Sequence, residues 1–353
     1  MSNIGKEVRV AVDTMGGDYA PGEIIKGAVT AARDDNVEVM LVGPTDIVGR
    51  ELTKYNGGCS YLPIRRVQAD EVIKEGEHPA LAIRRKPNAS IVVAMELLKA
   101  GEADAVISAG PTGAVSVSAI RSAGMLPGIE RPVVCVPLVG LAPNTVLVDG
   151  GANVDCRPQQ LLSFAVIGFF YAKKLLNVSK PRVALLSTGP EEGKGSRLTQ
   201  ESYTLLQNSN LNFIGNIEGS DLLSGKANVI VCDGIVGNVL MKFYESMGHY
   251  IAKWLKNKLD NSSLVSPIKK LLNQMGSFTR IVKDESGGGG LLWGVNSVVQ
   301  VLHGNSRAQQ VNKAIARAKY AVEADLIGCL KSELATIENE HSDYLNNCVR
   351  FTS

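Results

Sequence analysis

The sequence predicts an α/β protein in which helices cover both faces of a mostly parallel sheet. Short apolar runs typical of buried strands alternate along the chain with longer segments of helical periodicity. Many of the 36 glycines follow directly after the strand-like runs. Because ligands of such sheets bind beyond the carboxyl ends of the strands, we expect these glycine-rich turns to converge on one cleft.

The expected elements can be placed along the chain by their residue ranges. Strand-like runs cover residues 8–12, 37–42, 105–108, 133–138, 145–148, 182–186, 229–232 and 298–302, and the runs 133–138 and 145–148 follow each other as a pair. Helical patterns include residues 23–33, 91–100, 161–176 and 198–208. We expect a single α/β catalytic domain over residues 1–340. The glycine-rich segment 284–290 is the one obvious linker and is expected to be a mobile loop.

Composition excludes several classes of function. The formal net charge is +2 and only 5% of the residues are aromatic, so we expect no nucleic-acid partner. The six cysteines are scattered without a Cys-x-x-Cys pair and the four histidines lack ligand spacing, which predicts reduced thiols and no zinc site. The first strand begins within ten residues and the longest apolar run, 161–172, is too short to span a bilayer. We therefore expect a cytoplasmic protein.

The stretch 103–120 carries the clearest binding signal. A short buried strand at 105–108 is followed by Gly110 and Gly113, which let the backbone turn tightly and approach a ligand. A helix is expected from Thr112 onward, and its first N–H groups and dipole would attract an anion. The alternative is a plain strand-to-helix turn in which the small residues only serve packing.

Other turns contain residues of similar chemistry. Aspartates lie at or just beyond three strand ends, glycines bring backbone amides close, and asparagines supply neutral amide groups. The residues concerned are Asp13, Asp149, Asp233, Gly16, Gly17, Gly237, Asn153 and Asn238. Lys194 lies in a glycine-flanked turn and His303 follows the last strand-like run. Together with Ser108 and Thr112, these turns predict a site for an anionic substrate. The alternative is that the aspartates cap helices and the glycines only close turns.

The turns also occur as motifs in a recognisable order. The chain resembles the PlsX family of phosphate acyltransferases of bacterial phospholipid synthesis. The matching stretches cover residues 12–21, 108–114, 149–155, 191–195, 212–219, 231–238 and 303–304. Three positions depart from the family pattern: Pro111 stands where Asn is usual, Ile235 where Phe is usual, and Gly150 where Val is usual. Pro111 removes one amide donor from the predicted anion site.

The resemblance implies a reaction and a set of partners. Inorganic phosphate attacks the thioester of a fatty acyl chain on acyl carrier protein, giving acyl phosphate, and no cofactor is needed. The implied fold is the three-layer α/β/α fold of isocitrate dehydrogenases and phosphotransacetylases. A homodimer is implied, together with peripheral contact with the anionic cytoplasmic membrane face and with a downstream glycerol-phosphate acyltransferase.

The residues of this chain fit that chemistry in distinct roles. Lys194, Asn153 and Asp233 are the predicted catalytic residues, and Lys194 neutralises phosphate or the developing oxyanion. Substrate binding is assigned to Asp13, Gly16, Gly17, Ser108, Gly110, Thr112, Gly113, Gly237, Asn238 and His303. Among these, Ser108, Gly110, Thr112 and Gly113 are expected to hold phosphate, and His303 is the weakest candidate.

The sequence also allows two other functions, and it predicts one helical extension. Asp13, Asp149 and Asp233 together suit a divalent metal, as in a metal-dependent dehydrogenase of related fold. A non-catalytic acyl- or lipid-binding protein is the third possibility, because Pro111 and Ile235 depart from the family pattern.

Residues 245–280 are expected to form a helical hairpin, since apolar and lysine residues alternate at helical spacing over 250–275. The hairpin serves either a dimer contact or the membrane.

Overall fold

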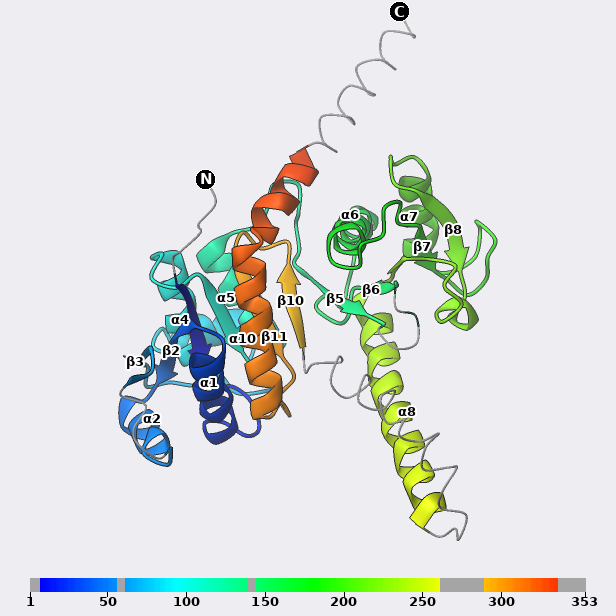
Figure 1. Cartoon of the computed structure of the whole chain (residues 1–353). Helices are drawn as coiled ribbons and strands as arrows, with labels where there is room; N and C mark the ends of the chain where they lie inside the picture. Colours follow the sequence, from blue (N-terminus) through cyan, green and yellow to red (C-terminus); the bar gives the residue numbers. More distant parts are fainter. Residues whose placement is uncertain (1–6, 56–60, 139–141, 143, 261–288, 336–353) are drawn as a thin grey trace, which may run out of the picture. The chain divides into compact units, whose positions relative to one another are not determined.

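The computed structural model describes residues 7–55, 61–138, 142, 144–260 and 289–335 (Figure 1). The chain forms two compact units. Unit 1 takes its residues from Met1–Pro132 and Gly288–Ser353, and unit 2 from Val133–Gly287. The single catalytic domain with a shared cleft, expected over residues 1–340, stays a prediction.

Unit 1 is built on a sheet with the strand order β3-β2-β1-β4-β11-β10. Every pair in this order is parallel except β10 with β11, which is antiparallel. The central strands β1, β2 and β4 are almost entirely buried, which explains their continuous apolar runs. The strands are β1 (Val8–Asp13), β2 (Val37–Gly43), β3 (Ile64–Gln68), β4 (Ala105–Ser108), β10 (Gly289–Trp293) and β11 (Val298–Leu302).

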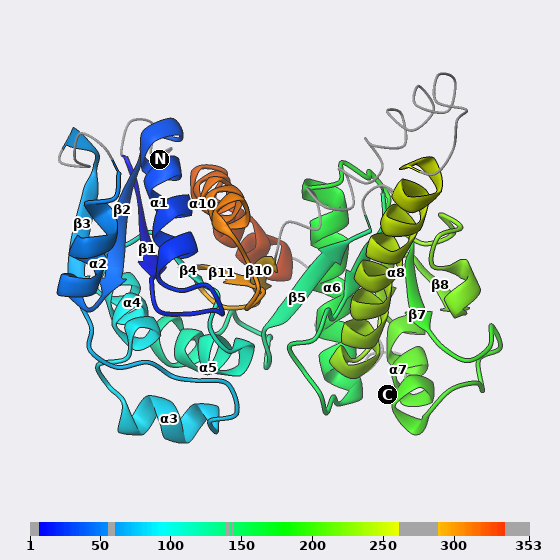
Figure 2. The same cartoon turned by 90° about the horizontal axis from the view of Figure 1, so that it is seen from below.

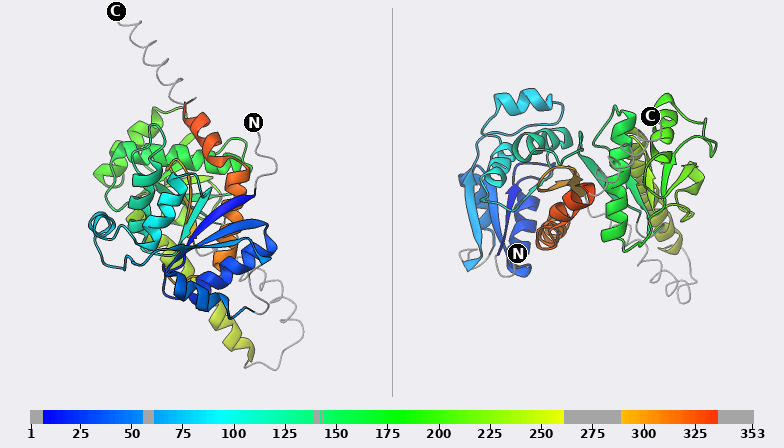
Figure 3. Two further views of the ribbon diagram at one scale, coloured as in Figure 1. Left: turned by 90° about the vertical axis from the view of Figure 1, so that its left-hand side faces the viewer. Right: turned by 90° about the horizontal axis from the view of Figure 1, so that it is seen from above.

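Helices cover both faces of the unit 1 sheet. Figure 2 shows α1 (Gly22–Asp34) and α10 (Ala308–Glu323) on one face, with α3 (Pro79–Arg85), α4 (Ser90–Lys99) and α5 (Thr112–Ala123) on the other. The right-hand view of Figure 3 shows the same layers from the opposite side. Helix α2 (Thr45–Leu52) follows β2. Gly27 permits the close contact of α1 with α10, since a Cβ there would lie 2.4 Å from the Ala308 carbonyl oxygen.

Unit 2 repeats the layered plan on a smaller sheet. Its strand order is β5-β6-β9-β7-β8, antiparallel between β5 and β6 and parallel elsewhere. Helices α6 and α7 lie on one face and α8 on the other (Figure 1). The elements are β5 (Val133–Pro137), β6 (Val146–Val148), α6 (Pro158–Lys174), β7 (Val183–Leu186), α7 (Arg197–Gln207), β8 (Phe213–Ile217), the 3-10 turn η2 (Gly219–Asp221), β9 (Val229–Val231) and α8 (Gly234–Asp260).

Each unit thus has the three-layer α/β/α architecture with a mostly parallel sheet, and the predicted fold class is confirmed. All eight predicted strands form, within one or two residues of the expected bounds. The mobile loop expected over 284–290 is wrong at Gly289 and Gly290, which pair with Leu302 and Val301 in β10. A Cβ at Gly289 would lie 1.9 Å from the Val301 carbonyl oxygen, so this glycine serves a close backbone approach rather than flexibility.

The predicted hairpin falls only partly on described residues. Its first half belongs to α8, which continues to Asp260, and its second half lies outside the described residues. In the part of the chain that the structure describes, no helix combines the length and apolarity that crossing a bilayer requires.

Candidate functional site

The first turn cluster lies in unit 1, at the carboxyl ends of β1, β4 and β11. It comprises residues 13–18, 108–113 and 303–305. Asp13, which ends β1, is buried, and its carboxylate accepts a hydrogen bond from Ser108 Oγ (2.6 Å) and from the Met15 amide (3.2 Å). Ser108 Oγ in turn accepts from the Gly110 amide (3.0 Å). Asp13, Ser108 and Gly110 therefore form a chain that fixes the two turns to each other.

Glycines allow the turns of this cluster to touch. A Cβ at Gly16 would lie 2.6 Å from the Gly110 nitrogen, and one at Gly17 would lie 3.0 Å from the Gly304 carbonyl oxygen. Gly17 also has a φ of +100°, a conformation that side chains disfavour. The Asp18 amide donates to that same Gly304 oxygen (2.7 Å), so the turn that begins at the half-buried His303 joins the other two.

The start of helix α5 is a solvent-exposed part of this cluster. Pro111 precedes its first residue, and no side chain caps the helix. Thr112 and Gly113 in the first turn are exposed. The N–H groups of a first helical turn have no partner within the helix, so this end of α5 can bind an anion. In contrast, Ser108 Oγ and the Gly110 amide already have partners, and their assignment to phosphate stays a prediction.

The second turn cluster lies in unit 2, after β6 and β9, and comprises residues 149–153 and 233–238. Its centre is Asp149, which is completely buried. The carboxylate accepts hydrogen bonds from the backbone amides of Val134 (3.2 Å), Gly151 (3.1 Å), Ala152 (3.1 Å) and Asn153 (2.8 Å). The Asn153 side-chain amide adds a fifth bond (2.9 Å). Asp149 is therefore surrounded by donors from its own unit.

The start of α8 completes the second cluster. Asp233 Oδ1 accepts from the Val236 amide (2.9 Å) and so caps the helix. The Gly234 amide donates to the Asn153 carbonyl (2.8 Å), and a Cβ at Gly237 would lie only 1.7 Å from the Asp149 carbonyl oxygen. The exposed Asn238 packs close to Gly151. The predicted residues Asn153, Asp233, Gly237 and Asn238 thus come together around Asp149.

Lys194 lies in the turn between β7 and α7, here called the Lys194 turn (residues 189–196). Its side chain is exposed, and within the described residues its ammonium makes no ion pair or hydrogen bond. The Lys194 amide donates to the Glu191 carbonyl (3.1 Å), and Ser196 caps α7 through the Thr199 amide. An exposed cation on a folded turn suits the recognition of an anion.

Burial raises the pKa of both central aspartates above the ordinary value of 3.8. Hydrogen bonds from the Ser108 and Ser90 hydroxyls oppose this effect at Asp13, and bonds from Ala152 and Asn153 oppose it at Asp149. Ser90, at the start of α4, was not singled out from the sequence because a helix-initiating serine carries no long-range signal.

Burial also disfavours the thiolate form of two cysteines near Asp149. Burial, with the Asp149 charge as a further cause, raises the pKa of Cys135 and of Cys232 well above the usual thiol value. Among the described residues no group of three or more His, Cys, Asp or Glu side chains is arranged to hold a metal ion. Asp149 and Asp233, two of the three acids that the dehydrogenase alternative requires, are instead bonded to backbone amides.

Residues 8–328 match the family described as fatty acid synthesis protein. The chain belongs to that family. A phosphate acyltransferase of Pelotomaculum thermopropionicum is 43% identical over 94% of this chain and 96% of its own length. One of Gloeobacter violaceus is 40% identical over 95% of this chain and 99% of its own length. Membership of the fatty acid synthesis protein family therefore supports an acyltransferase of fatty acid or phospholipid synthesis, and the predicted resemblance is confirmed.

Solved structures support the fold. A phosphotransacetylase from Streptococcus pyogenes aligns with a TM-score of 0.60 at 18% identity, over 90% of this chain and 95% of its own. A phosphotransacetylase from Staphylococcus aureus, EutD, aligns with a TM-score of 0.56 at 20% identity, over 90% of this chain and 95% of its own. The predicted phosphotransacetylase-like architecture is thus confirmed.

Proposed function

We propose that this protein forms acyl phosphate from fatty acyl-acyl carrier protein and inorganic phosphate. The observation that carries the proposal is the match to the fatty acid synthesis protein family over nearly the whole described chain, with relatives named phosphate acyltransferase. The uncapped, exposed start of α5 adds a place for an anionic substrate.

The proposed reaction needs little covalent help from the protein. A phosphate oxygen attacks the thioester carbonyl carbon, a carbon–oxygen bond forms, and the carbon–sulfur bond breaks. The proton of the hydrogen phosphate ion passes to the departing thiolate of the carrier protein. Phosphate is already nucleophilic and a thiolate leaves readily, so catalysis consists of positioning and charge stabilisation. The raised pKa of Cys135 and Cys232 makes neither buried thiol a suitable nucleophile.

The role proposed for each residue follows from its exposure and from the hydrogen bonds that it already makes. The first-turn amides of α5, at Thr112 and Gly113, bind phosphate, with Ser108 and Asp13 fixing the turn behind them. Lys194 neutralises phosphate or the oxyanion that develops on the thioester carbonyl. In the second turn cluster, Asn153 and Asp233 shape the start of α8, and the exposed Asn238 orients the thioester end.

The proposed partners include a second copy of the chain and an anionic membrane surface. Helix α8 packs Met241 into the unit 2 core, yet it exposes large apolar side chains every three or four residues. These are Ile235, Val236, Val239, Phe243, Met247, Tyr250, Ile251 and Trp254. A stripe of this size needs cover, and a homodimer through α8 supplies it. Membrane contact and delivery to a glycerol-phosphate acyltransferase suit an amphiphilic product.

Two variants test the partner proposal. Val239→Glu with Phe243→Glu should convert the dimer to monomer in analytical ultracentrifugation, whereas Leu223→Glu, at an exposed apolar residue outside α8, should not. Unchanged mass of the first variant, together with loss of sedimentation with anionic vesicles, would assign the stripe to the membrane instead.

The decisive experiment is an activity assay with a chelator present. Purified protein, fatty acyl-acyl carrier protein and inorganic phosphate should yield acyl phosphate, trapped as a hydroxamate, and free carrier-protein thiol in equal amounts. Nicotinamide-dependent oxidation that requires a divalent metal would favour the dehydrogenase alternative. Binding of acyl chains without turnover would favour the lipid-binding alternative.

A further inference from the structure

We propose that Asn216 is a positioning residue that holds the Lys194 turn, assisted by Gln200. The inference rests on the proposed function only through the role of Lys194. Asn216 belongs to the stretch 212–219, which matches the family pattern but has no part in the roles given above.

Asn216 reaches the turn from the neighbouring strand. It lies in β8, which pairs in parallel with β7, the strand from which the turn emerges. Its side chain is buried, and Asn216 Nδ2 donates to the Glu191 carbonyl (2.8 Å). That oxygen also accepts from the Lys194 amide (3.1 Å). One carbonyl therefore couples the buried amide to the backbone of the lysine.

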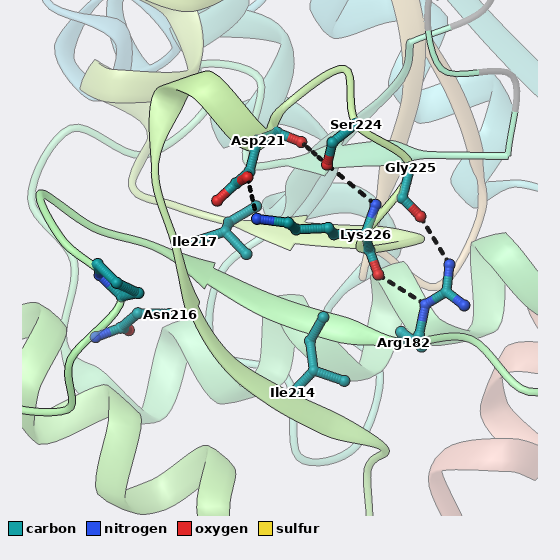
Figure 4. A pocket seen from close by; sticks show the side chains of 9 residues that line it. Arg182, Ile214, Asn216, Ile217, Asp221, Ser224, Gly225 and Lys226 are labelled. Atoms are coloured by element: carbon teal, nitrogen blue, oxygen red, sulfur yellow. Dashed lines mark hydrogen bonds and ion pairs between the residues drawn. The ribbon is translucent and has the colours of Figure 1, made fainter.

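The other polar atom of the Asn216 side chain, its carboxamide oxygen, gives no further explanation for the residue. Asn216 Oδ1 is buried and has no hydrogen-bond partner among the described residues. A buried amide left half satisfied is costly, which argues that its single bond is worth keeping. Figure 4 shows Asn216 apart from the network of Arg182, Asp221 and Lys226 that lines the same pocket. Those charged groups bind one another and nearby carbonyls, so they do not account for Asn216.

Gln200 holds the other side of the turn. From α7, its Nε2 donates to the carbonyls of Gly193 (2.9 Å) and Gly195 (3.1 Å). Gly195 has a φ of +94°, and a Cβ there would lie 2.8 Å from Ser187 Oγ. The stem of Lys194 folds back over Gly189, since a Cβ at Gly189 would lie 3.0 Å from Lys194 Cγ. The lysine is thus exposed but mounted on a backbone fixed at three carbonyls.

Such mounting matters for a group that stabilises charge. An exposed lysine on a loose turn loses conformational entropy when it binds an anion, whereas a prearranged turn has already lost most of it. Small displacements of a catalytic group cost activity steeply. We therefore expect Asn216→Ala to act through Lys194 and not by a general loss of structure.

The test is a double-mutant cycle on the full chain. Acyl phosphate formation is measured with phosphate varied for Asn216→Ala, Lys194→Ala and the double variant. Asn216→Ala should lower kcat/KM about tenfold. The double variant should be no slower than Lys194→Ala alone, because without the lysine the Asn216 side chain, here called the clamp, has no catalytic group to position. Multiplying effects in the double variant would overturn the proposal.

The matched control is Asn228→Ala in the same unit. Asn228 is equally buried, 7% exposed like Asn216, and its Nδ2 also donates to a carbonyl, that of Asn144 (3.0 Å). It should lower Tm at least as much as Asn216→Ala does, since its Oδ1 also accepts from the Arg182 amide (3.1 Å), and leave kcat/KM within about twofold. An equal loss of kcat/KM in Asn228→Ala would assign Asn216 a merely structural role. Should Asn216→Ala not fold, Gln200→Ala, at an exposed side chain, is used in the same cycle.

A readout without turnover separates this inference from the proposed function. Hydrogen exchange of the peptide covering residues 189–196 should speed up at the Lys194 amide in Asn216→Ala and not in Asn228→Ala. Unchanged exchange would overturn the clamp even if activity fell. If the wild-type protein makes no acyl phosphate but Asn216→Ala still shows the faster exchange, the proposed reaction is refuted and the positioning role of Asn216 stands.

Discussion

Asp13 in unit 1 and Asp149 in unit 2 are buried aspartates at the ends of parallel strands, but the turns around them differ. Asp149 accepts five hydrogen bonds, four of them from backbone amides. Near it, Asp233 caps α8. Asp13 instead accepts from Ser108, and the nearby helix α5 is uncapped. In the second cluster the start of α8 is capped by a side chain of the protein itself. In the first cluster the start of α5 has no such cap and is available to a ligand.

The largest expected effect tests the closed character of the second cluster. In Gly237→Ala the new methyl group would meet the Asp149 carbonyl oxygen at 1.7 Å, and backbone on both sides must shift. We expect a loss of about 3 kcal/mol or more in the free energy of unfolding, measured by urea titration. Gly219→Ala, where the added Cβ has nothing within 4 Å, is the control and should stay within about 0.5 kcal/mol. Equal stability of the two variants would contradict the closed packing.

Lys194→Ala asks whether unit 2 supplies a catalytic charge despite its closed cluster. Because the ammonium has no partner among the described residues, the fold should be unaffected. Acyl phosphate formation should fall by about 10²-fold, the scale of losing one charge stabiliser. Lys180→Ala removes an exposed lysine of the same unit and should keep full activity. Near-wild-type rates for Lys194→Ala at saturating phosphate would remove Lys194 from the mechanism.

Pro111→Asn tests whether the uncapped start of α5 binds phosphate. The substitution restores an N–H and adds a side-chain amide where α5 begins, so phosphate should bind up to about tenfold more tightly, as one hydrogen bond allows. The KM for phosphate reports this. Pro44→Asn is a close control, since Pro44 precedes α2 with nearly the same backbone angles, φ −59° and ψ 113° against −54° and 123° at Pro111. Phosphate affinity that rises in neither variant, or in both, would show that position 111 faces away from the ligand.

The smallest effect concerns the acid titration of Asp13. Burial raises the pKa of Asp13, so the folded protein holds more protons on it than the unfolded chain. The free energy of unfolding therefore falls as pH rises from about 3.9 through the raised pKa. Asp13→Asn removes this titration, so the free energy of unfolding of the variant minus that of wild type should increase across that range in denaturant titrations. A difference that stays constant with pH would mean that Asp13 does not titrate abnormally.

Much of the fold could be predicted because strand and turn signals are local. The run 105–108 became β4 without change, since apolar residues bounded by glycine have few other uses. Strands β3 and β8 were not singled out, because exposed residues interrupt the apolar run, as the adjacent Arg65 and Arg66 do in β3. Gly289 read as a linker because no sequence pattern reveals that another backbone passes 1.9 Å from its missing Cβ.

The candidate site was predicted less completely than the fold. The sequence reveals the residue types at the turns. It does not reveal which of these side chains already make hydrogen bonds within the protein. Asp149 and Asp233 illustrate this, since Asp149 accepts from the backbone amides of residues 134 and 151–153, and Asp233 accepts from that of residue 236. Asn216 illustrates the converse, because its partner Glu191 lies 25 residues away and no local rule connects them.

Unit 1 is assembled from two segments of the chain separated by the whole of unit 2. During synthesis, β4 therefore leaves the ribosome long before β11, its neighbour in the sheet. The entire sequence of unit 2 is translated while that edge of β4 lacks its partner, and unit 2 can fold first. The Gly304 carbonyl that secures Asp18 arrives still later. The turns of the first cluster are thus completed in a nascent chain only when almost all of the protein has been made, and until then this edge of β4 presents unpaired backbone groups.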